Sequence, residues 1–192
     1  MAVLLLAASS CRHRPTAIQV PVQYLSYDDA VRRPAKSTIS GKRVVLKVEN
    51  RFGEEPQIGQ DASAGVPILA EPGELTRLVG SGFQREVGLR GAQLAAAGDA
   101  ADVILAVGVT VVSVEEGARY TARIVAQIEA STPGGEVLAS SILEGGSTHG
   151  GEDYNGDQVN MALNKALADL IARVFTNPSL MAALSRGGPP AQ

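Results

Sequence analysis

The stretch DVILAVGVTVVSV, residues 102–114, contains the densest run of strand-forming side chains in the chain. Because β-branched residues favour an extended backbone, the stretch predicts one long strand of mostly apolar character. Glu115, Glu116 and Gly117 follow it directly and predict a charged turn. The chain is therefore expected to reverse here and to pair the long strand with the residues that come next.

The residues after this turn predict two further strands. Apolar and polar side chains alternate over residues 118–130, and this period of two is typical of a strand with one covered face. Residues 132–135, Thr-Pro-Gly-Gly, predict a second turn, and residues 136–144 predict a third strand. Three strands joined by two tight turns predict an antiparallel meander with one face covered and the other in water.

Two amphipathic helices are predicted on either side of this meander. The first begins near Pro72 and has apolar residues at spacings of three and four: Leu75, Leu78, Val79, Phe83, Val87 and Leu89. Gly80, Gly82 and Gly88 interrupt it, and we expect them to allow close packing on a sheet. The second helix follows a Gly-rich segment, residues 145–151, expected to be a loop. Its apolar stripe comprises Val159, Leu163, Leu167, Leu170, Ile171 and Val174.

The order of these elements predicts an α+β fold. Residues 42–50 form a further strand, separated from the first helix by a loop of about 20 residues rich in Gly and Pro. If this strand is parallel to the strand at 102–114, the first helix is a right-handed crossover. The predicted architecture is a mixed sheet of one strand, a crossover helix and a three-strand antiparallel meander, covered on one face by two helices.

The start of the chain predicts where the protein resides. An apolar run, residues 2–8, and two serines precede Cys11, the only cysteine. This pattern resembles a bacterial lipoprotein signal, in which the cysteine after the cleavage point becomes the lipidated, palmitate-carrying N-terminus. No Lys or Arg precedes the run, and the alternative is an N-terminal element of the fold with a buried cysteine. The next four residues argue against that alternative, because charged residues and proline rarely continue a buried helix or strand: Arg12, His13, Arg14 and Pro15.

These features divide the chain into four expected parts. Residues 1–10 are the signal peptide, 11–41 the lipid anchor and a flexible tether, 42–185 a single α+β domain, and 186–192 a disordered tail. Within the tether, alternating residues from Ile18 to Leu25 could pair at a sheet edge. The residue directly after the cysteine is Arg12 and not Asp, and in this the chain resembles lipoproteins that are sorted to the outer membrane. The expected location is the periplasmic side of the cell outer membrane.

Composition argues against several functional classes. The net charge is −3, which provides no basic field for nucleic acid, and aromatic residues are 4% with no Trp. A lone cysteine leaves no thiolate zinc site. His149, with Glu152 and Asp153, is the sole cluster of potential metal ligands in the predicted domain, and a solvated loop is the expected state there. We therefore expect no metal, no cofactor and no small-molecule substrate.

The sequence also lacks the motifs of a hydrolase. Ser140, Ser141 and Ser147 lack the Gly-x-Ser-x-Gly context of a hydrolase nucleophile, and a catalytic triad would need His149. Glu115 and Glu116 are expected to be a charged turn only. The sequence predicts no catalytic residue and no enzyme.

The chain also resembles a known family over nearly its whole length after residue 10, most clearly over residues 75–184. The resemblance rests on the lipobox-like start, the Gly59-Gln60-Asp61 loop, the helix ending at Gly82-Phe83, the turn at residues 117–120 and the closing ALADLI helix, residues 166–171. These features are similar to the YajG-like bacterial lipoproteins. The resemblance implies a cell-envelope lipoprotein.

Three functional hypotheses follow. The first is a membrane-anchored, noncatalytic module that faces the periplasm and binds another envelope protein, with Cys11 as its link to the membrane. The second is an accessory lipoprotein of an envelope transport or export complex, which predicts an exposed sheet edge or apolar patch for docking. The third is an envelope hydrolase that uses His149.

Overall fold

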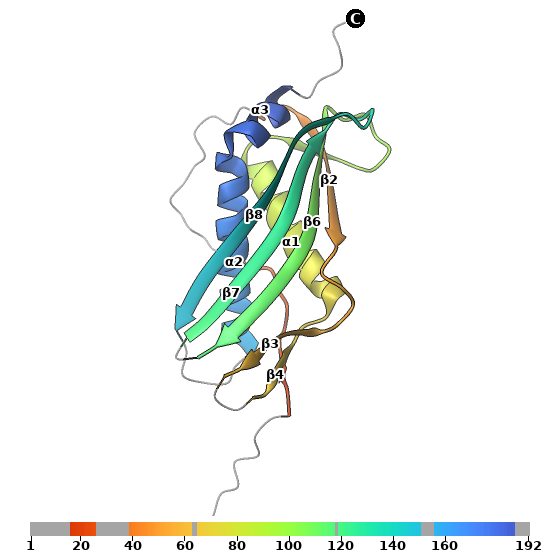
Figure 1. The fold of residues 1–192 in the computed structure, drawn as a ribbon. Coiled ribbons are helices and arrows are strands. Elements are labelled where there is room, and N and C mark those ends of the chain that lie inside the picture. Colours follow the sequence, from red (N-terminus) through yellow and green to blue (C-terminus); the bar gives the residue numbers. More distant parts are fainter. Residues whose placement is uncertain (1–15, 26–38, 63–64, 118, 151–155, 187–192) are drawn as a thin grey trace, which may run out of the picture.

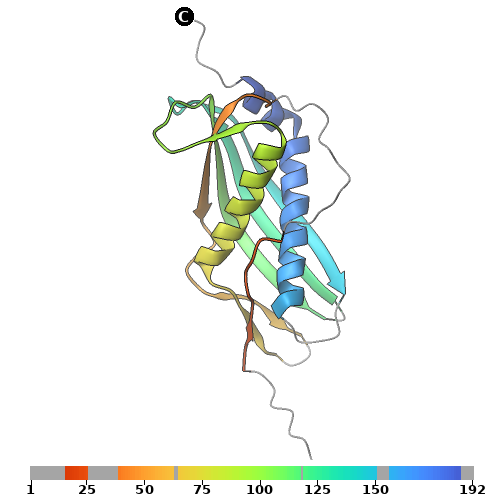
Figure 2. The same ribbon diagram turned by 180° about the vertical axis from the view of Figure 1, so that it is seen from behind.

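The computed structural model describes residues 16–25, 39–62, 65–117, 119–150 and 156–186, which form an α+β fold with helices on one face of a sheet (Figures 1 and 2). In chain order the elements are β1 (Ile18–Gln19), β2 (Arg43–Asn50), β3 (Gln57–Asp61), β4 (Pro67–Leu69), α1 (Pro72–Leu89), β5 (Gln93–Ala95), β6 (Val103–Glu116), β7 (Arg119–Ser131), β8 (Val137–Gly150), α2 (Gly156–Thr176) and α3 (Pro178–Arg186).

The long strand β6 organises the mixed sheet. It pairs antiparallel with β7 along one side, and β7 pairs antiparallel with β8. On its other side, the first half of β6 pairs parallel with β2 and its last three residues pair parallel with β3. The predicted meander and the predicted parallel strand are therefore confirmed. Strand β8 lies at one edge of the sheet.

Helices α1 and α2 cover one face of the sheet together, as predicted (Figure 2). Their buried stripes, including Phe83 and Leu167, pack with the inward residues of β6 and β7 in a continuous core. Gly82 was expected to allow close packing on a sheet, but at this position α1 packs on α2 instead. A Cβ on Gly82 would lie 2.8 Å from Leu167 Cδ2. None of the helices in the described part of the chain is long and apolar enough to cross a bilayer.

The Gly-rich segment expected as a loop is strand up to Gly150, so that prediction was wrong. The reason lies in helix packing. A Cβ on Gly145 would collide with the carbonyl oxygen of Ala166 and would lie 2.5 Å from the backbone nitrogen of Leu170. Glycine inside a strand often marks the close approach of another backbone. Here it allows α2 to rest directly on β8.

Part of the expected flexible tether belongs to the folded body. Strand β1 pairs parallel with β4, with Ile18 opposite Ile68, and the side chains of Ile18 and Val20 are buried. The predicted pairing of this alternating segment at a sheet edge is thus confirmed, and the fold includes residues well before Lys42. The signal peptide and Cys11 lie outside the described residues, as does nearly all of the predicted tail.

Candidate functional site

A row of polar side chains crosses the helix-covered side of the sheet near the β6–β7 turn. Asp61 of β3 is in register with Glu116 of β6, Glu116 with Tyr120 of β7, and Tyr120 with His149 of β8. Residues opposite one another in register share a face of the sheet. His149 Nδ1 then lies 2.7 Å from Lys165 Nζ on α2. We call these five residues the polar row.

The carboxyl groups of Asp61 and Glu116 form the buried part of the polar row. Their residues are 1% and 7% exposed. Burial raises the pKa of Glu116, the negative charge of Asp61 raises it further, and a hydrogen bond from Tyr120 offsets part of the rise. Two buried carboxylates side by side repel each other, so Glu116 holds its proton to a higher pH than an exposed glutamate does.

This environment makes stability depend on pH, and Glu116→Gln is the variant that tests it. The pKa of Glu116 in the folded state lies above the ordinary 4.5, so the folded protein binds a proton that the unfolded chain releases. Stability should therefore fall as pH rises from about 4.5 through the raised pKa. The neutral amide removes this loss, and the variant should unfold at higher denaturant concentration than the parent at pH 8.

The matched control for this prediction is Glu115→Gln. Glu115 is the adjacent residue and is exposed. Urea unfolding at pH 5 and pH 8 should show a smaller pH dependence in Glu116→Gln than in the parent, while Glu115→Gln keeps the parental dependence. Equal pH dependence in all three proteins would contradict the assignment of the buried carboxyl pair.

The expectation that Glu115 and Glu116 form a charged turn together was wrong. Glu116 is the last residue of β6 and points to the same side as Val112 and Val114, which are buried. Extending the alternation of the strand by one step would have placed Glu116 inward. Its partner Asp61 offered no such signal, because the short strand β3 lies within a segment expected to be a loop.

An open pocket of about 710 Å³ adjoins the polar row between the β3–β4 and β6–β7 turns. Its lining includes Gln60, Glu115, Arg119 and Thr148, so carboxylate and guanidinium groups both face it. Within the described residues, no group of three or more His, Cys, Asp or Glu is placed to hold a metal ion. Glu152 and Asp153, the expected neighbours of His149, lie outside the described residues. His149 itself lies on β8 and faces α2.

The opposite face of the sheet, which we call the outer face, carries charged and polar residues beside apolar ones. Arg51 donates to Glu49 at 2.7 Å and to Gln127 at 2.9 Å, and Arg123 donates to Glu144 at 2.8 Å. This agrees with the predicted water-exposed face. The large apolar residue Ile142 of β8 also lies on this face and is 73% exposed.

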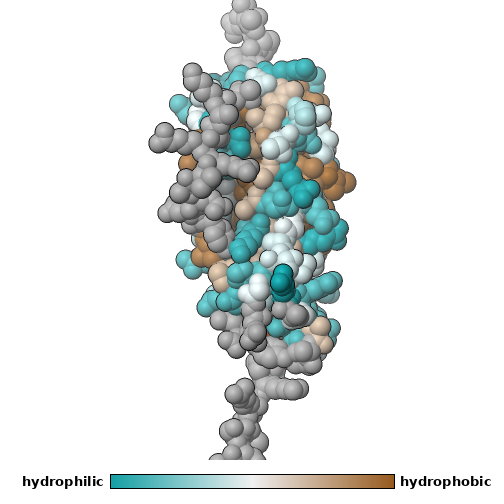
Figure 3. All heavy atoms as spheres, turned by 90° about the vertical axis from the view of Figure 1, so that its left-hand side faces the viewer, coloured by the Kyte–Doolittle hydropathy of each residue, from teal (hydrophilic) through white to brown (hydrophobic). Residues whose placement is uncertain are grey.

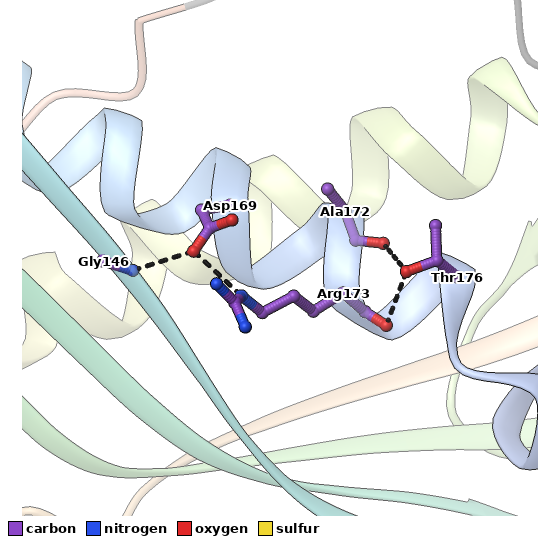
Figure 4. A network of polar contacts seen from close by, with 5 residues as sticks. All are labelled: Gly146, Asp169, Ala172, Arg173 and Thr176. Carbon is purple, nitrogen blue, oxygen red and sulfur yellow. Dashed lines mark hydrogen bonds and ion pairs between the residues drawn. The ribbon is translucent and has the colours of Figure 1, made fainter.

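The edge of β8 is protected at one point by α2. Asp169 accepts a hydrogen bond from the N–H of Gly146 at 3.0 Å and another from Arg173 Nε at 2.9 Å (Figure 4). The N–H of Gly146 points away from β7, because it donates to Asp169 on α2. Along an antiparallel strand the backbone N–H and C=O groups of every second residue point to the same side. By this alternation Ser140, Ile142 and Glu144 present theirs to the edge. No described strand pairs with β8 on that side.

The fold resembles solved structures, whereas the sequence matches no family model and no curated protein. A Xanthomonas campestris protein of the DUF330 family is 17% identical, with a TM-score of 0.58 over 88% of this chain and 97% of that one. A minor lipoprotein from Acinetobacter baumannii is 11% identical, with a TM-score of 0.42 over 71% and 94%. The first comparison shows a shared fold. Membership in the YajG-like family stays a prediction.

Proposed function

We propose that this chain is a lipid-anchored bacterial envelope protein, and that it serves as a noncatalytic binding module on the periplasmic side of the outer membrane. The cysteine that follows the apolar N-terminal run supports the anchor, with Cys11 as the acylated residue. The polar row supports a structural role for the titratable groups, because Asp61 and Glu116 are buried together and His149 faces Lys165.

The observation that carries the binding role is the edge strand β8. It is 14 residues long, contains no Lys or Pro, and has Glu144 as its only acidic residue. Exposed edges are usually blunted by lysine, proline or bulges, because an open edge recruits another strand. The pairing of β8 with β7 shifts register only between Val137 and Ala139, at the start of the strand. Ile142 adds an exposed apolar side chain beside that edge. β8 therefore fits an extended segment of another envelope protein, which would pair with it as an added strand.

A second candidate is an accessory lipoprotein of an envelope transport or export complex. This hypothesis predicted an exposed sheet edge, and β8 is such an edge. In this case the added strand would come from a subunit of that complex. Co-purification of transporter subunits with the anchored protein distinguishes the two candidates.

The test is photo-crosslinking in living cells. A benzoylphenylalanine at Ser140 should give an adduct with one specific partner, because Ser140 is exposed and presents its backbone to the edge. The same group at Arg77, an exposed position on α1, is the control and should not give that adduct. Ile142→Lys, which places a cation beside the edge, should remove the adduct from Ser140. Adducts that are the same at both positions, or that survive Ile142→Lys, would contradict strand addition at β8.

A further inference from the structure

Residues 16–25, which we call the strap, are held on α2 by two asparagines. Asn160 and Asn164 are 4% and 2% exposed. Asn160 Oδ1 accepts the N–H of Gln23 at 3.1 Å, and Asn164 Oδ1 accepts the N–H of Leu25 at 2.8 Å. Asn164 Nδ2 also donates to the carbonyl of Gln23 at 2.9 Å. The two amides satisfy polar backbone groups of the strap and are satisfied by them.

The strap is fixed at two further places. Val20 donates its N–H to Leu69 at 2.9 Å, next to the β1–β4 pairing. The first residue of α2 forms a notch for the strap, because a Cβ on Gly156 would collide with the carbonyl oxygen of Gln19 and lie 2.9 Å from Pro21 Cδ. The strap is therefore held along its length, at the edge of the sheet and on α2.

The strap begins at one end of an elongated molecule. Its first residues lie beside β3 and β4, at the end of the sheet where β6 turns into β7 (Figures 1 and 2). We call this end, marked by Ala62, Gly65 and Gly117, the hairpin pole. The β7–β8 turn, residues 132–136, and α3 lie at the opposite end, the far pole. At about 3.3 Å per residue, the 13-residue strand β7 separates the two poles by about 40 Å.

This arrangement limits the distance between the folded domain and a lipid attached to Cys11. Only five peptide steps join Cys11 to Thr16, the first residue of the strap, and they span at most about 18 Å. Without the strap, the first buried residue in the described part of the body would be Ile39, and a tether from Cys11 to Ile39 could reach about 100 Å. We propose that the strap holds the hairpin pole against the bilayer surface, within about 18 Å of the lipid. The inference rests on the proposed acylation of Cys11.

The distribution of exposed apolar side chains agrees with this orientation. The large exposed hydrophobic residues of the described chain are Leu89, Leu94, Val137 and Ile142. Leu89, Leu94 and Val137 lie at the end of α1, in β5 and at the start of β8, which are near the far pole (Figures 1 and 2). The hairpin pole carries none of them, so it faces the membrane surface without inserting. The apolar positions point toward the periplasm, where a protein partner can reach them.

The orientation can be measured by energy transfer to the membrane. The thiol of Cys11 is consumed by lipidation, so a cysteine introduced as Glu115→Cys or Glu136→Cys is the only one available for a donor dye. These exposed residues lie at the hairpin pole and the far pole, respectively. The protein, purified from its host membrane, is placed in phosphatidylethanolamine–phosphatidylglycerol vesicles that contain an acceptor-labelled lipid. Transfer from position 115 should exceed transfer from position 136 by about twofold or more, given the separation of about 40 Å.

Variants that release the strap provide the decisive comparison. Gly156→Ala places a methyl group against Gln19 and should make transfer from the two positions nearly equal. Gly73→Ala is the matched control, because Gly73 also lies in the first turn of a helix but a Cβ there meets no atom within 4 Å. Asn164→Leu, which removes the two hydrogen bonds between Asn164 and the strap at similar volume, should act like Gly156→Ala. In both releasing variants the amides of Gln23 and Leu25 should exchange with solvent at least about tenfold faster.

The outcomes separate this inference from the proposed anchor. Bound protein with equal transfer from positions 115 and 136, or variants that expose the strap without changing the transfer ratio, would overturn the membrane-facing hairpin pole alone. Protein that does not bind the vesicles would overturn the anchor and, with it, this inference.

Figure 3 shows the side of the molecule that borders the β8 edge, where brown apolar patches interrupt a mostly polar surface. In the proposed orientation this side stands perpendicular to the membrane. A partner strand could then pair with β8 without approaching the lipid. The binding role and the orientation are thus compatible.

Discussion

Gly145→Ala should lower the free energy of unfolding by roughly 3 kcal/mol, because the added methyl group has no space between β8 and α2. It would collide with the carbonyl oxygen of Ala166 and lie 2.6 Å from Leu170 Cβ. Moving α2 away from β8 would disturb the core, since Leu167 and Leu170 of this helix are fully buried. For a domain of this size the loss corresponds to a decrease of about 6 to 12 °C in Tm, measured by thermal unfolding.

The adjacent residue provides the control. A Cβ on Gly146 meets no atom within 4 Å, and its backbone has no positive φ. Gly146→Ala also keeps the N–H that donates to Asp169. Its stability should stay within about 1 kcal/mol of the parent. If both variants unfold at the same temperature, α2 does not rest on β8 as described.

Cys11→Ala should release the protein from the membrane completely. Acylation with two or more chains gives stable anchoring, whereas removal of the thiol leaves no atom to acylate. The measurement is fractionation of cells into membrane and soluble parts, with detection of the protein in each.

Ser9→Ala is the control for this change, because it alters the same short segment but keeps the thiol and a small side chain. It should remain in the membrane fraction. Sedimentation of Cys11→Ala with membranes, at the level of the parent, would contradict the lipid anchor. The orientation proposed for the hairpin pole would then be contradicted as well.

Periodic patterns in the sequence predicted the larger elements because periodicity reports burial. The alternation over 118–130 placed Tyr120 and Ile124 inward, and both are buried in the structure. The helix predicted from near Pro72 begins there, since proline suits the first turn of a helix. The covered face and the outer face followed from the same alternation.

The unpredicted features depend on contacts between segments distant in sequence. The glycines of β8 look like a loop locally, and only the presence of α2 explains why Gly145 occupies a strand. Asn160 and Asn164 lie on a helix where polar residues are usually exposed, and they are buried because the strap covers them. The pairing of Asp61 with Glu116 likewise depends on the register of two strands 55 positions apart.

The central claim is that this domain is a lipid-anchored envelope module, and intact mass spectrometry of the protein purified from its host membrane tests it most directly. The account predicts a mass equal to residues 11–192 plus the acyl groups on Cys11. An unmodified chain that begins at Met1 would contradict it.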